Sequence, residues 1–442
     1  MPRWVARAPC PAVPPHAQVF CPMLRLLFLI VAVLTLAPNA SAQSRVILFI
    51  GDGVGVSYWT AARYASPDAL AISQFKVMGL VDTRASNNLI TDSAAGATAY
   101  SAGVRTFNGA IGVGPDSTPA ETVLEGAMKK GWATGLVATS SITHATPASF
   151  AAHVTSRGSE FDIAKQMAVL KPDVMLGGGM RFFSAATRPD REDLVAALRT
   201  THAVVSDSAG LQSLGDSVRK VVGLFAANEM PAAPDRTPTL AAMTRKAIDI
   251  LSRDREGFFL MVEGSQPDWR GHSNRPIQEV IDEMRDYDVA IGVALEYQRR
   301  MPDVLILVVS DHETGGLAIH TARDSAVLAS AASALNSAVA PLERAMPLLT
   351  GQAADSADSA LVRMQITSAR LRASARGART PRLMATYTTT GHTGQMIPLF
   401  AKGPGAEAFG GMIDNYRVGQ MLLDIVRKPQ LPSRRRPPEP GR

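Results

Sequence analysis

Five short, continuous apolar runs constrain most strongly what this chain can fold into. They are RVILFIGDG at 45–53, GLVATS at 135–140, DVMLGG at 173–178, FFLMVEG at 258–264 and VLILVVSD at 304–311. Runs of this length that do not alternate with polar residues are typical of strands buried on both faces. Helical patterns lie between them. The sequence therefore predicts an α/β fold, a three-layer sandwich with a mostly parallel central sheet.

Two of the intervening segments carry clear helical patterns. Segment 117–131 has Ser and Thr at its start, Pro in its first turn and Gly at its end, which predicts a helix over that range. Ile277, Val280, Ile281 and Met284 follow the i, i+3, i+4, i+7 spacing of a helix with one buried face. The order strand, loop, helix thus repeats along the chain.

The first 42 residues predict a secretory signal. They contain no acidic residue, and an apolar run at 26–37 follows Arg25 and ends just before an Ala-x-Ala triplet. We expect cleavage after Ala42, a true start at Met23, and a periplasmic or secreted mature protein. The alternative is a membrane anchor, but the run is shorter than the roughly 20 residues that a spanning helix needs.

The composition of the remaining chain indicates one large catalytic domain over 43–427. A chain of 442 residues with 46% hydrophobic content can bury a sizeable core, which excludes disorder as its dominant state. Both cysteines, Cys10 and Cys21, lie in the leader, so the predicted mature chain has no disulfide. The positive net charge of +6 is concentrated in the leader and in the Pro-rich tail 428–442. We therefore expect a disordered basic tail and no nucleic-acid-binding face.

Acidic and histidine side chains follow several of the predicted strands. The residues are Asp52 after the first run, His144 and Thr146 after the second, Glu263, Asp268 and His272 at the fourth, and Asp311 and His312 at the fifth. The carboxyl ends of parallel strands lie at one edge of a sheet, where sites in open α/β sheets form. Their oxygen and nitrogen atoms are ligands for divalent cations. A single Asp at a strand end could equally be a helix cap. Acidic and histidine residues at the ends of several strands, however, predict a multi-metal centre.

Ser93 is a candidate nucleophile. It precedes a run of small residues in ITDSAAGATAYSAGV at 90–104, which we interpret as the start of a helix. Backbone N–H groups and the positive end of the helix dipole favour an anionic substrate and an alkoxide at such a position. An isolated Ser at a helix start is usually an ordinary N-cap. Metals nearby would make a nucleophile the better interpretation of Ser93.

Together these segments resemble the bacterial alkaline phosphatases. The matching stretches are TDSAAGATA at 91–99, FNGAIGV at 107–113, HATPASFAAHVTSR at 144–157, VEGSQPDWRGH at 262–272, SDHETGG at 310–316 and GHTGQ at 391–395. They span roughly residues 50 to 410 in the order that is usual for the family. No single stretch is specific for the family, but the ordered set is.

The resemblance implies a centre with two Zn²⁺ and one Mg²⁺. Asp268, His272 and His392 would hold one Zn²⁺, and Asp52, Asp311 and His312 would hold the second. Asp52 would also bridge to Mg²⁺, with Thr146 and Glu263 as further ligands, and Arg157 would bind two phosphate oxygens. His144 stands where some family members carry Asp, and Trp269 stands where many carry Lys or His. They would lie next to the ligands and the phosphate.

The function that the resemblance implies is a secreted, metal-dependent phosphomonoesterase acting through a phosphoserine on Ser93. Its substrates would be small phosphate monoesters, its product inorganic phosphate, and its oligomeric state a homodimer. Two alternatives stay open, a phosphodiesterase of the same superfamily and a non-catalytic zinc-dependent phosphate-binding protein. Residues 321–385, rich in Ala, Ser and Arg, match no family motif, and we expect a helical insertion or a flexible cap near the active site.

Overall fold

The computed structural model describes residues 44–321, 325–348 and 383–428, together with 357, 360–361, 363–365 and 367–368. The predicted leader at 1–42 and residues 429–442 of the predicted tail lie outside the described residues. Within the described ranges, no helix is long and apolar enough to cross a membrane.

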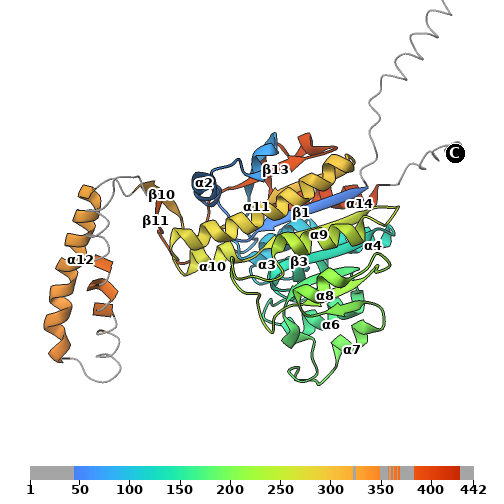
Figure 1. Ribbon diagram of the computed structural model, residues 1–442, viewed down its shortest axis with the longest axis horizontal. Helices are drawn as coiled ribbons and strands as arrows, with labels where there is room; N and C mark the ends of the chain where they lie inside the picture. The colour runs from blue at the N-terminus through green and yellow to red at the C-terminus, as the bar shows by residue number, and fades with distance from the viewer. Residues whose placement is uncertain are drawn as a thin grey trace, which may run out of the picture. The chain divides into compact units, whose positions relative to one another are not determined.

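A ten-stranded sheet forms the centre of the fold (Figure 1). Its strand order is β14-β2-β13-β8-β1-β7-β3-β4-β6-β5, and every neighbouring pair is parallel except the two that β13 makes with β2 and β8. The predicted, mostly parallel α/β sheet is confirmed. The strands are β1 (Arg45–Gly51), β2 (Val77–Asp82), β3 (Ala133–Ser141), β4 (Val174–Gly178), β5 (Ala203–Val205), β6 (Val221–Leu224), β7 (Phe258–Gly264), β8 (Val304–Val309), β13 (Ile397–Lys402) and β14 (Gly411–Asp414).

Strand β1 shows why the central strands are apolar throughout. Val46, Leu48 and Ile50 point into the hydrophobic core on one face of the sheet, and Ile47 and Phe49 point into the core on the other. All five side chains are fully buried. Successive side chains of a strand point to opposite faces, so a strand with a core on each side has no position left for polar side chains.

Helices cover both faces of the sheet (Figure 1). The first core includes residues of α3 (Ser93–Ala102), α4 (Val123–Lys129), α5 (Ala145–Ala151), α6 (Glu160–Leu170), α7 (Leu194–Arg199) and α14 (Asn415–Arg427). The second includes residues of α2 (Val56–Ala65), α8 (Ser208–Ser213), α9 (Leu240–Leu251) and α11 (Ile277–Arg300). The helix predicted from the spacing of residues 277–284 is confirmed, and the three layers are those of the predicted sandwich.

The helix predicted over 117–131 is shorter than expected, and its start was placed wrongly. Helix α4 begins at Val123, because Thr122 and Glu125 form a capping box there. Ser117 has a left-handed φ of 65°, a conformation incompatible with a right-handed helix. The proline that suggested a first turn, Pro119, instead forms an isolated bridge with Val113.

The insertion starts and ends at a two-stranded sheet. Strand β10 (Ala318–Thr321) pairs in antiparallel register with β11 (Leu383–Thr386). Helix α12 (Ser325–Ala345) lies between them in the sequence. Of the two predictions for residues 321–385, a helical insertion or a flexible cap, the helical one is correct for this segment. Ala332 and Val339, seven residues apart, are its buried apolar side chains among those described, as expected for a helix that buries one narrow stripe.

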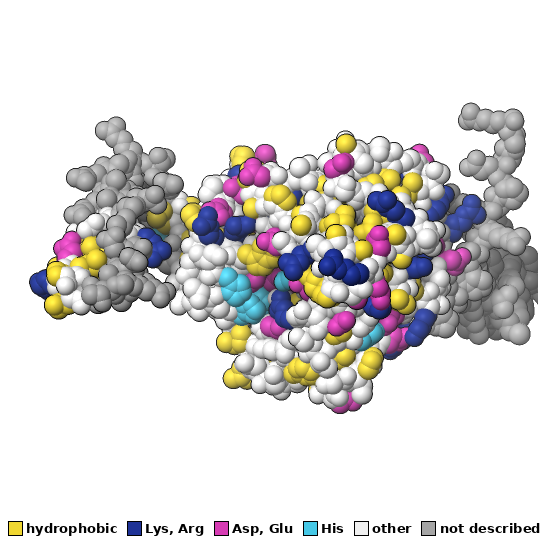
Figure 2. Space-filling view, turned by 90° about the horizontal axis from the view of Figure 1, so that it is seen from below, with side chains coloured by type: hydrophobic (Ala, Val, Ile, Leu, Met, Phe, Trp, Pro, Cys, Tyr) yellow, Lys and Arg dark blue, Asp and Glu magenta, His cyan; other side chains and the backbone are white. Residues whose placement is uncertain are grey.

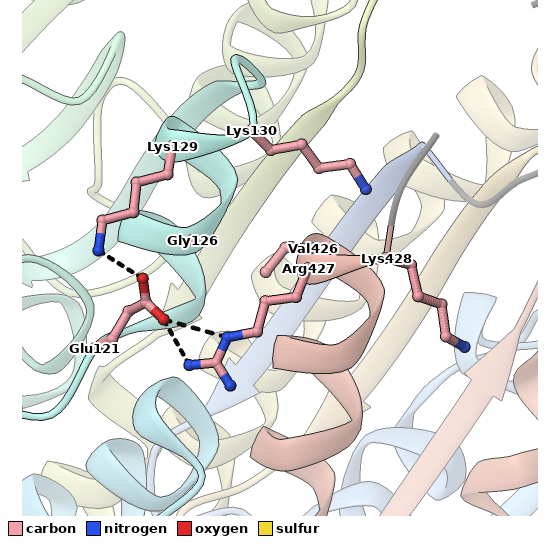
Figure 3. A pocket seen from close by; sticks show the side chains of 7 residues that line it. All are labelled: Glu121, Gly126, Lys129, Lys130, Val426, Arg427 and Lys428. Atoms are coloured by element: carbon pink, nitrogen blue, oxygen red, sulfur yellow. Dashed lines mark hydrogen bonds and ion pairs between the residues drawn. The ribbon is translucent and has the colours of Figure 1, made fainter. Parts of the chain in front are cut away.

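Helices α4 and α14 end close together at a cavity of about 410 Å³ (Figure 3). Glu121 accepts hydrogen bonds from Lys129 and Arg427, and Lys130 Nζ donates to the Ile425 carbonyl at 3.2 Å. Basic side chains complement the negative ends of helix dipoles. The basic character of this cavity is therefore accounted for by helix capping.

Candidate metal centre

The carboxyl ends of three neighbouring strands position the acidic residues that the sequence singled out. Asp52 directly follows β1, Glu263 is the last residue but one of β7, and Asp311 and His312 follow β8. All four side chains are fully buried. Strands β7, β1 and β8 are adjacent in the sheet, so their carboxyl ends converge at one place, as the sequence predicts.

Asp52, Asp311 and His312 form the first group, with one potential ligand atom from each within 4.8 Å of the others. His312 Nε2 lies 3.5 Å from Asp52 Oδ1 and 3.3 Å from Asp311 Oδ2. The hydroxyl oxygen of Ser93 lies 3.2 Å from the same His312 nitrogen. The candidate nucleophile therefore stands beside this group.

Asp268, His272 and His392 form the second group. Asp268 and His272 lie on α10 (Gln266–His272), and His392 begins the short strand β12 (His392–Thr393), which pairs with β9 (Glu313–Thr314). His272 Nε2 lies 3.0 Å from His392 Nε2 and 3.3 Å from Asp268 Oδ1. The rings of His312 and His392 stack with their centroids 3.5 Å apart, so the two groups adjoin. This group is the more exposed one, because 39% of the His272 side chain is accessible.

A third group brings Asp52 and Glu263 together with His144, again with one atom of each within 4.8 Å of the others. Thr146 is fully buried on α5, and its hydroxyl has no hydrogen-bond partner among the described residues. The ring of Trp269 meets the His144 ring edge-on at 6.0 Å. The structure therefore places His144 directly beside the predicted third metal site and Trp269 behind it.

Helix α3 places Ser93 at its first position. Asp92 is the N-cap, and its carboxylate accepts a hydrogen bond from the Ala95 N–H at 3.0 Å. All ten residues of α3 are buried, which its run of small side chains permits. The predicted helix start is confirmed, and Ser93 is only 2% exposed.

Asp92 also holds the predicted phosphate-binding residue. Its Oδ2 accepts from Arg157 Nη1 at 3.1 Å and from the Gly109 N–H at 3.0 Å. Arg157 Nη2 lies 3.2 Å from His144 Nε2. Sequence reasoning missed Asp92, although its place directly before Ser93 is a visible N-cap signal.

Several oxygens of the buried carboxylates accept no hydrogen bond within the described part of the chain. Neither oxygen of Asp52 and only one oxygen of Asp311 accepts a hydrogen bond from any described residue. Burial, and then the charges of neighbouring acids, raises the pKa of Asp52 well above its ordinary value. Burial likewise raises the pKa of Glu263 to about 7. Buried carboxylates without partners are costly, and bound cations are the usual remedy.

The three histidines all turn their Nε2 atoms toward the carboxylates. His272 Nδ1 lies 2.5 Å from the Thr390 carbonyl oxygen, and His392 Nδ1 lies 2.9 Å from that of Thr91. His312 Nδ1 lies 3.2 Å from the Thr314 hydroxyl. Each of these oxygens can accept from a protonated Nδ1, the tautomer in which the Nε2 lone pair can bind a metal.

Thr314 is a second residue that sequence reasoning missed. Its hydroxyl donates a hydrogen bond to Asp268 Oδ1 and faces His312 Nδ1, so a single hydroxyl contacts one ligand from each of the first two groups. Thr314 lies in the SDHETGG stretch, but the sequence alone gave it no role. Burial lowers the pKa of His312 to about 3, so His312 is the neutral imidazole that metals bind.

Comparisons with known proteins identify the family of this chain. The family model for alkaline phosphatase matches residues 43–427. Alkaline phosphatase 3 of Bacillus subtilis is 36% identical over 440 residues, covering 88% of this chain and 92% of the relative. The streptomycin-6-phosphate phosphatase of Streptomyces griseus is 35% identical over 63% of this chain and 78% of its own length.

Solved structures show the same fold. A variant of the alkaline phosphatase from the Antarctic bacterium TAB5, with Mg bound in a site designated M3, has a TM-score of 0.70 and 33% identity, covering 88% of this chain and all of that one. The alkaline phosphatase of Thermus thermophilus has a TM-score of 0.73 and 25% identity, covering 95% of this chain and 97% of its own. The resemblance inferred from the motifs is confirmed, and this chain belongs to the alkaline phosphatase family, the enzymes of metal-dependent phosphomonoester hydrolysis.

Proposed function

We propose that this enzyme hydrolyses phosphate monoesters through a phosphoserine formed on Ser93, at a centre that holds two Zn²⁺ and one Mg²⁺. One observation carries the proposal. The buried Ser93 hydroxyl lies at the start of α3 and 3.2 Å from His312 Nε2, beside buried carboxylates of which Asp52 accepts no hydrogen bond from any described residue.

The donor sets fit the proposed cations. Two groups combine carboxylate oxygens with imidazole nitrogens, a set that suits Zn²⁺. They are Asp268, His272 and His392, and Asp52, Asp311 and His312. Asp52, Glu263 and Thr146 offer oxygens, as Mg²⁺ prefers, and His144 lies beside them. The TAB5 variant that binds Mg in its M3 site has an aspartate in place of a histidine. When bound, the cations would neutralise charge that develops on the phosphoryl, attacking and leaving oxygens.

Ser93 and Arg157 perform the steps that the protein itself supplies. The Ser93 oxygen attacks phosphorus as the bond to the ester oxygen breaks, and the proton that the Ser93 hydroxyl loses is balanced by the one that the departing alkoxide takes up from solvent. Water then attacks the phosphoserine from the side that the alcohol left, which releases phosphate and restores the hydroxyl. Arg157 would bind two non-bridging oxygens with its planar guanidinium, which Asp92 holds in place.

Export and assembly are further parts of the proposal. The apolar run at 26–37 supports a mature enzyme that begins at Gln43 and is periplasmic or secreted. N-terminal sequencing of the exported protein tests the cleavage site. The family resemblance supports a homodimer, which light scattering of the purified enzyme tests.

Release of phosphate from an aryl phosphate tests the catalytic proposal. The chain from Gln43, supplied with Zn²⁺ and Mg²⁺, should hydrolyse the monoester rapidly, and a chelator or Ser93→Ala should abolish that activity. Mass spectrometry of acid-quenched enzyme should find phosphate on Ser93. Faster turnover of a bis-aryl phosphodiester would instead make the enzyme a diesterase, and no turnover with metals bound would favour the phosphate-binding protein.

A further inference from the structure

Three large apolar side chains are exposed in segments that adjoin the second candidate metal-binding group. Leu89 is 75% exposed, and Ile90 and Met396 are each 39% exposed. They are three of the eleven large hydrophobic side chains that are exposed in the described ranges, and they come from two segments that flank site residues. Leu89 and Ile90 shortly precede Ser93, and Met396 shortly follows His392.

These two segments are in contact at the site. His392 Nδ1 donates to the Thr91 carbonyl at 2.9 Å, which ties the segment before Ser93 to a ligand of the second group. A Cβ placed on Gly394 would lie 3.9 Å from Ile90 Cγ1, so the Ile90 side chain packs over the chain just after His392. Figure 2 shows histidine side chains gathered at the surface of one face, with hydrophobic side chains close by.

The segment that carries Leu89 and Ile90 is held rigidly. Asn108 Nδ2 donates to the Ile90 carbonyl at 3.0 Å, and Asn108 Oδ1 accepts from the Asp92 N–H at 3.0 Å. The Ile90 N–H donates to Asn88 Oδ1 at 3.1 Å. A backbone tied at these points holds its apolar side chains toward solvent in a fixed arrangement, which lowers the entropy lost when a ligand contacts them.

The chemistry of the reaction places a leaving group at this position. An in-line displacement expels the alcohol on the side opposite the attacking Ser93 oxygen. Ser93 stands against the fully buried first group, whereas the second group reaches solvent at His272, whose side chain is 39% accessible. We therefore infer that the variable part of a substrate extends past His272 and His392, toward the two segments that carry the three apolar side chains.

We propose that Leu89, Ile90 and Met396 form an apolar ledge that binds the leaving group of the substrate, and that the enzyme favours phosphate monoesters of apolar alcohols. This inference rests on the proposed phosphomonoesterase function. Complete burial of one methylene group is worth about fourfold in a binding constant, and a ledge covers one side of an alkyl chain only. We therefore expect kcat/KM to rise roughly twofold per methylene from ethyl to hexyl phosphate.

The test compares wild type with the triple variant L89S/I90S/M396S and with Met412→Ser. Met412 is a matched control, because it is 72% exposed and lies on the edge strand β14. The hexyl-to-ethyl ratio of kcat/KM should fall to nearly one in the triple variant and keep its wild-type value in Met412→Ser. A wild-type ratio near one, or the same ratio in the triple variant, would overturn the ledge.

Binding of alkylphosphonates separates the failure of the ledge from the failure of the proposed function. These compounds carry the same alkyl chains but are not hydrolysed, and calorimetry measures their dissociation constants without turnover. Affinity that rises with chain length in wild type and not in the triple variant supports the ledge even if no ester is hydrolysed. Equal affinities for ethyl- and hexylphosphonate would contradict it even if aryl phosphates are turned over rapidly.

Discussion

At the residue scale, Thr314 connects the two candidate metal-binding groups through one hydroxyl. The hydroxyl donates to Asp268 and accepts from the Nδ1 of His312, so it orients a carboxylate of one group and fixes the tautomer of a histidine in the other. Residues in this role change metal affinity or activity by roughly 10–100-fold when they are replaced. We expect Thr314→Val to lower Zn²⁺ affinity by about that factor.

Competition with a chromogenic chelator measures the loss of Zn²⁺ affinity. Thr314→Ser keeps the hydroxyl and serves as the control, so it should bind Zn²⁺ nearly as tightly as wild type. Circular dichroism checks that both variants are folded. Equal Zn²⁺ affinities for the Val and Ser variants would show that the hydroxyl does not organise the site.

A second prediction at this scale concerns the contact between Asp92 and Arg157. Asp92→Asn retains an oxygen to cap α3 but places an NH₂ group where Oδ2 now accepts from Arg157 and from the Gly109 N–H. A hydrogen bond between charged groups contributes about 1.5–3 kcal/mol. We expect the KM for an aryl phosphate to rise about tenfold or more, with a smaller change in kcat.

A double-mutant cycle decides whether Asp92 acts through Arg157. If it does, Asp92→Asn should add little to the loss already caused by Arg157→Ala, because the two side chains share one interaction. Additive losses in kcat/KM would assign Asp92 a role that is independent of Arg157, such as capping α3.

At the element scale, helix α3 lies so close to the end of β8 that Gly96 has no room for a side chain. A Cβ at Gly96 would lie 3.0 Å from both the Cβ and the carbonyl oxygen of Asp311. Helix α3 is held from its other sides by α5 and α14. Gly96→Ala should therefore displace Asp311, lower the free energy of unfolding by about 1–3 kcal/mol and weaken metal binding.

Gly292→Ala in α11 is the matched control for that prediction. The nearest atom to its new Cβ would be Ala71 Cβ at 3.6 Å, an ordinary contact. Alanine is the better helix former, so this variant should be as stable as wild type or up to about 1 kcal/mol more stable. Denaturant unfolding of both variants gives the comparison. A neutral Gly96→Ala would mean that α3 can move away from Asp311 without loss.

The elements also show how far the sequence predicts the fold. Strands β1, β7 and β8 were predicted because two cores make them apolar throughout, and the placement of ligands at their carboxyl ends followed from sheet geometry. Edge elements carry a weaker signal. In β2, Met78 and Leu80 are exposed between more buried neighbours. This strand was therefore not predicted from the sequence. The start of α4 was misjudged because Ser117 and Pro119 match the sequence signal of a helix start. The helix begins only after Thr122, which forms the capping box.

At the scale of the whole molecule, the sequence indicated which residues meet but not what orients them. Asp268, His312 and their partners were predicted from strand ends and motifs, and the structure brings them together. The Thr314–Asp268 and Asp92–Arg157 contacts join residues 46 and 65 positions apart. No local pattern marks such a pair, because its geometry depends on how α10 and the loops after α5 and β8 pack on the finished sheet.

The same buried acids make the stability of the whole molecule depend on metals and pH. Burial raises the pKa of Asp52 well above its ordinary value and that of Glu263 from 4.5 to about 7 when no cation is present. With a raised pKa in the folded state, the unfolded chain releases its proton at lower pH than the folded chain does. The free energy of unfolding of the metal-free protein must then fall as pH rises between the two pKa values.

We therefore expect chelated enzyme to lose thermal stability steadily from about pH 5 to pH 7. Metal-loaded enzyme should not, because bound cations stabilise the ionised carboxylates and bind more tightly as protons leave. Calorimetric melting temperatures of both forms across this range measure the effect, and the gap between them should widen with pH. A constant gap would mean that the acids of the centre are already ionised in the metal-free protein, and that something other than metal compensates their burial.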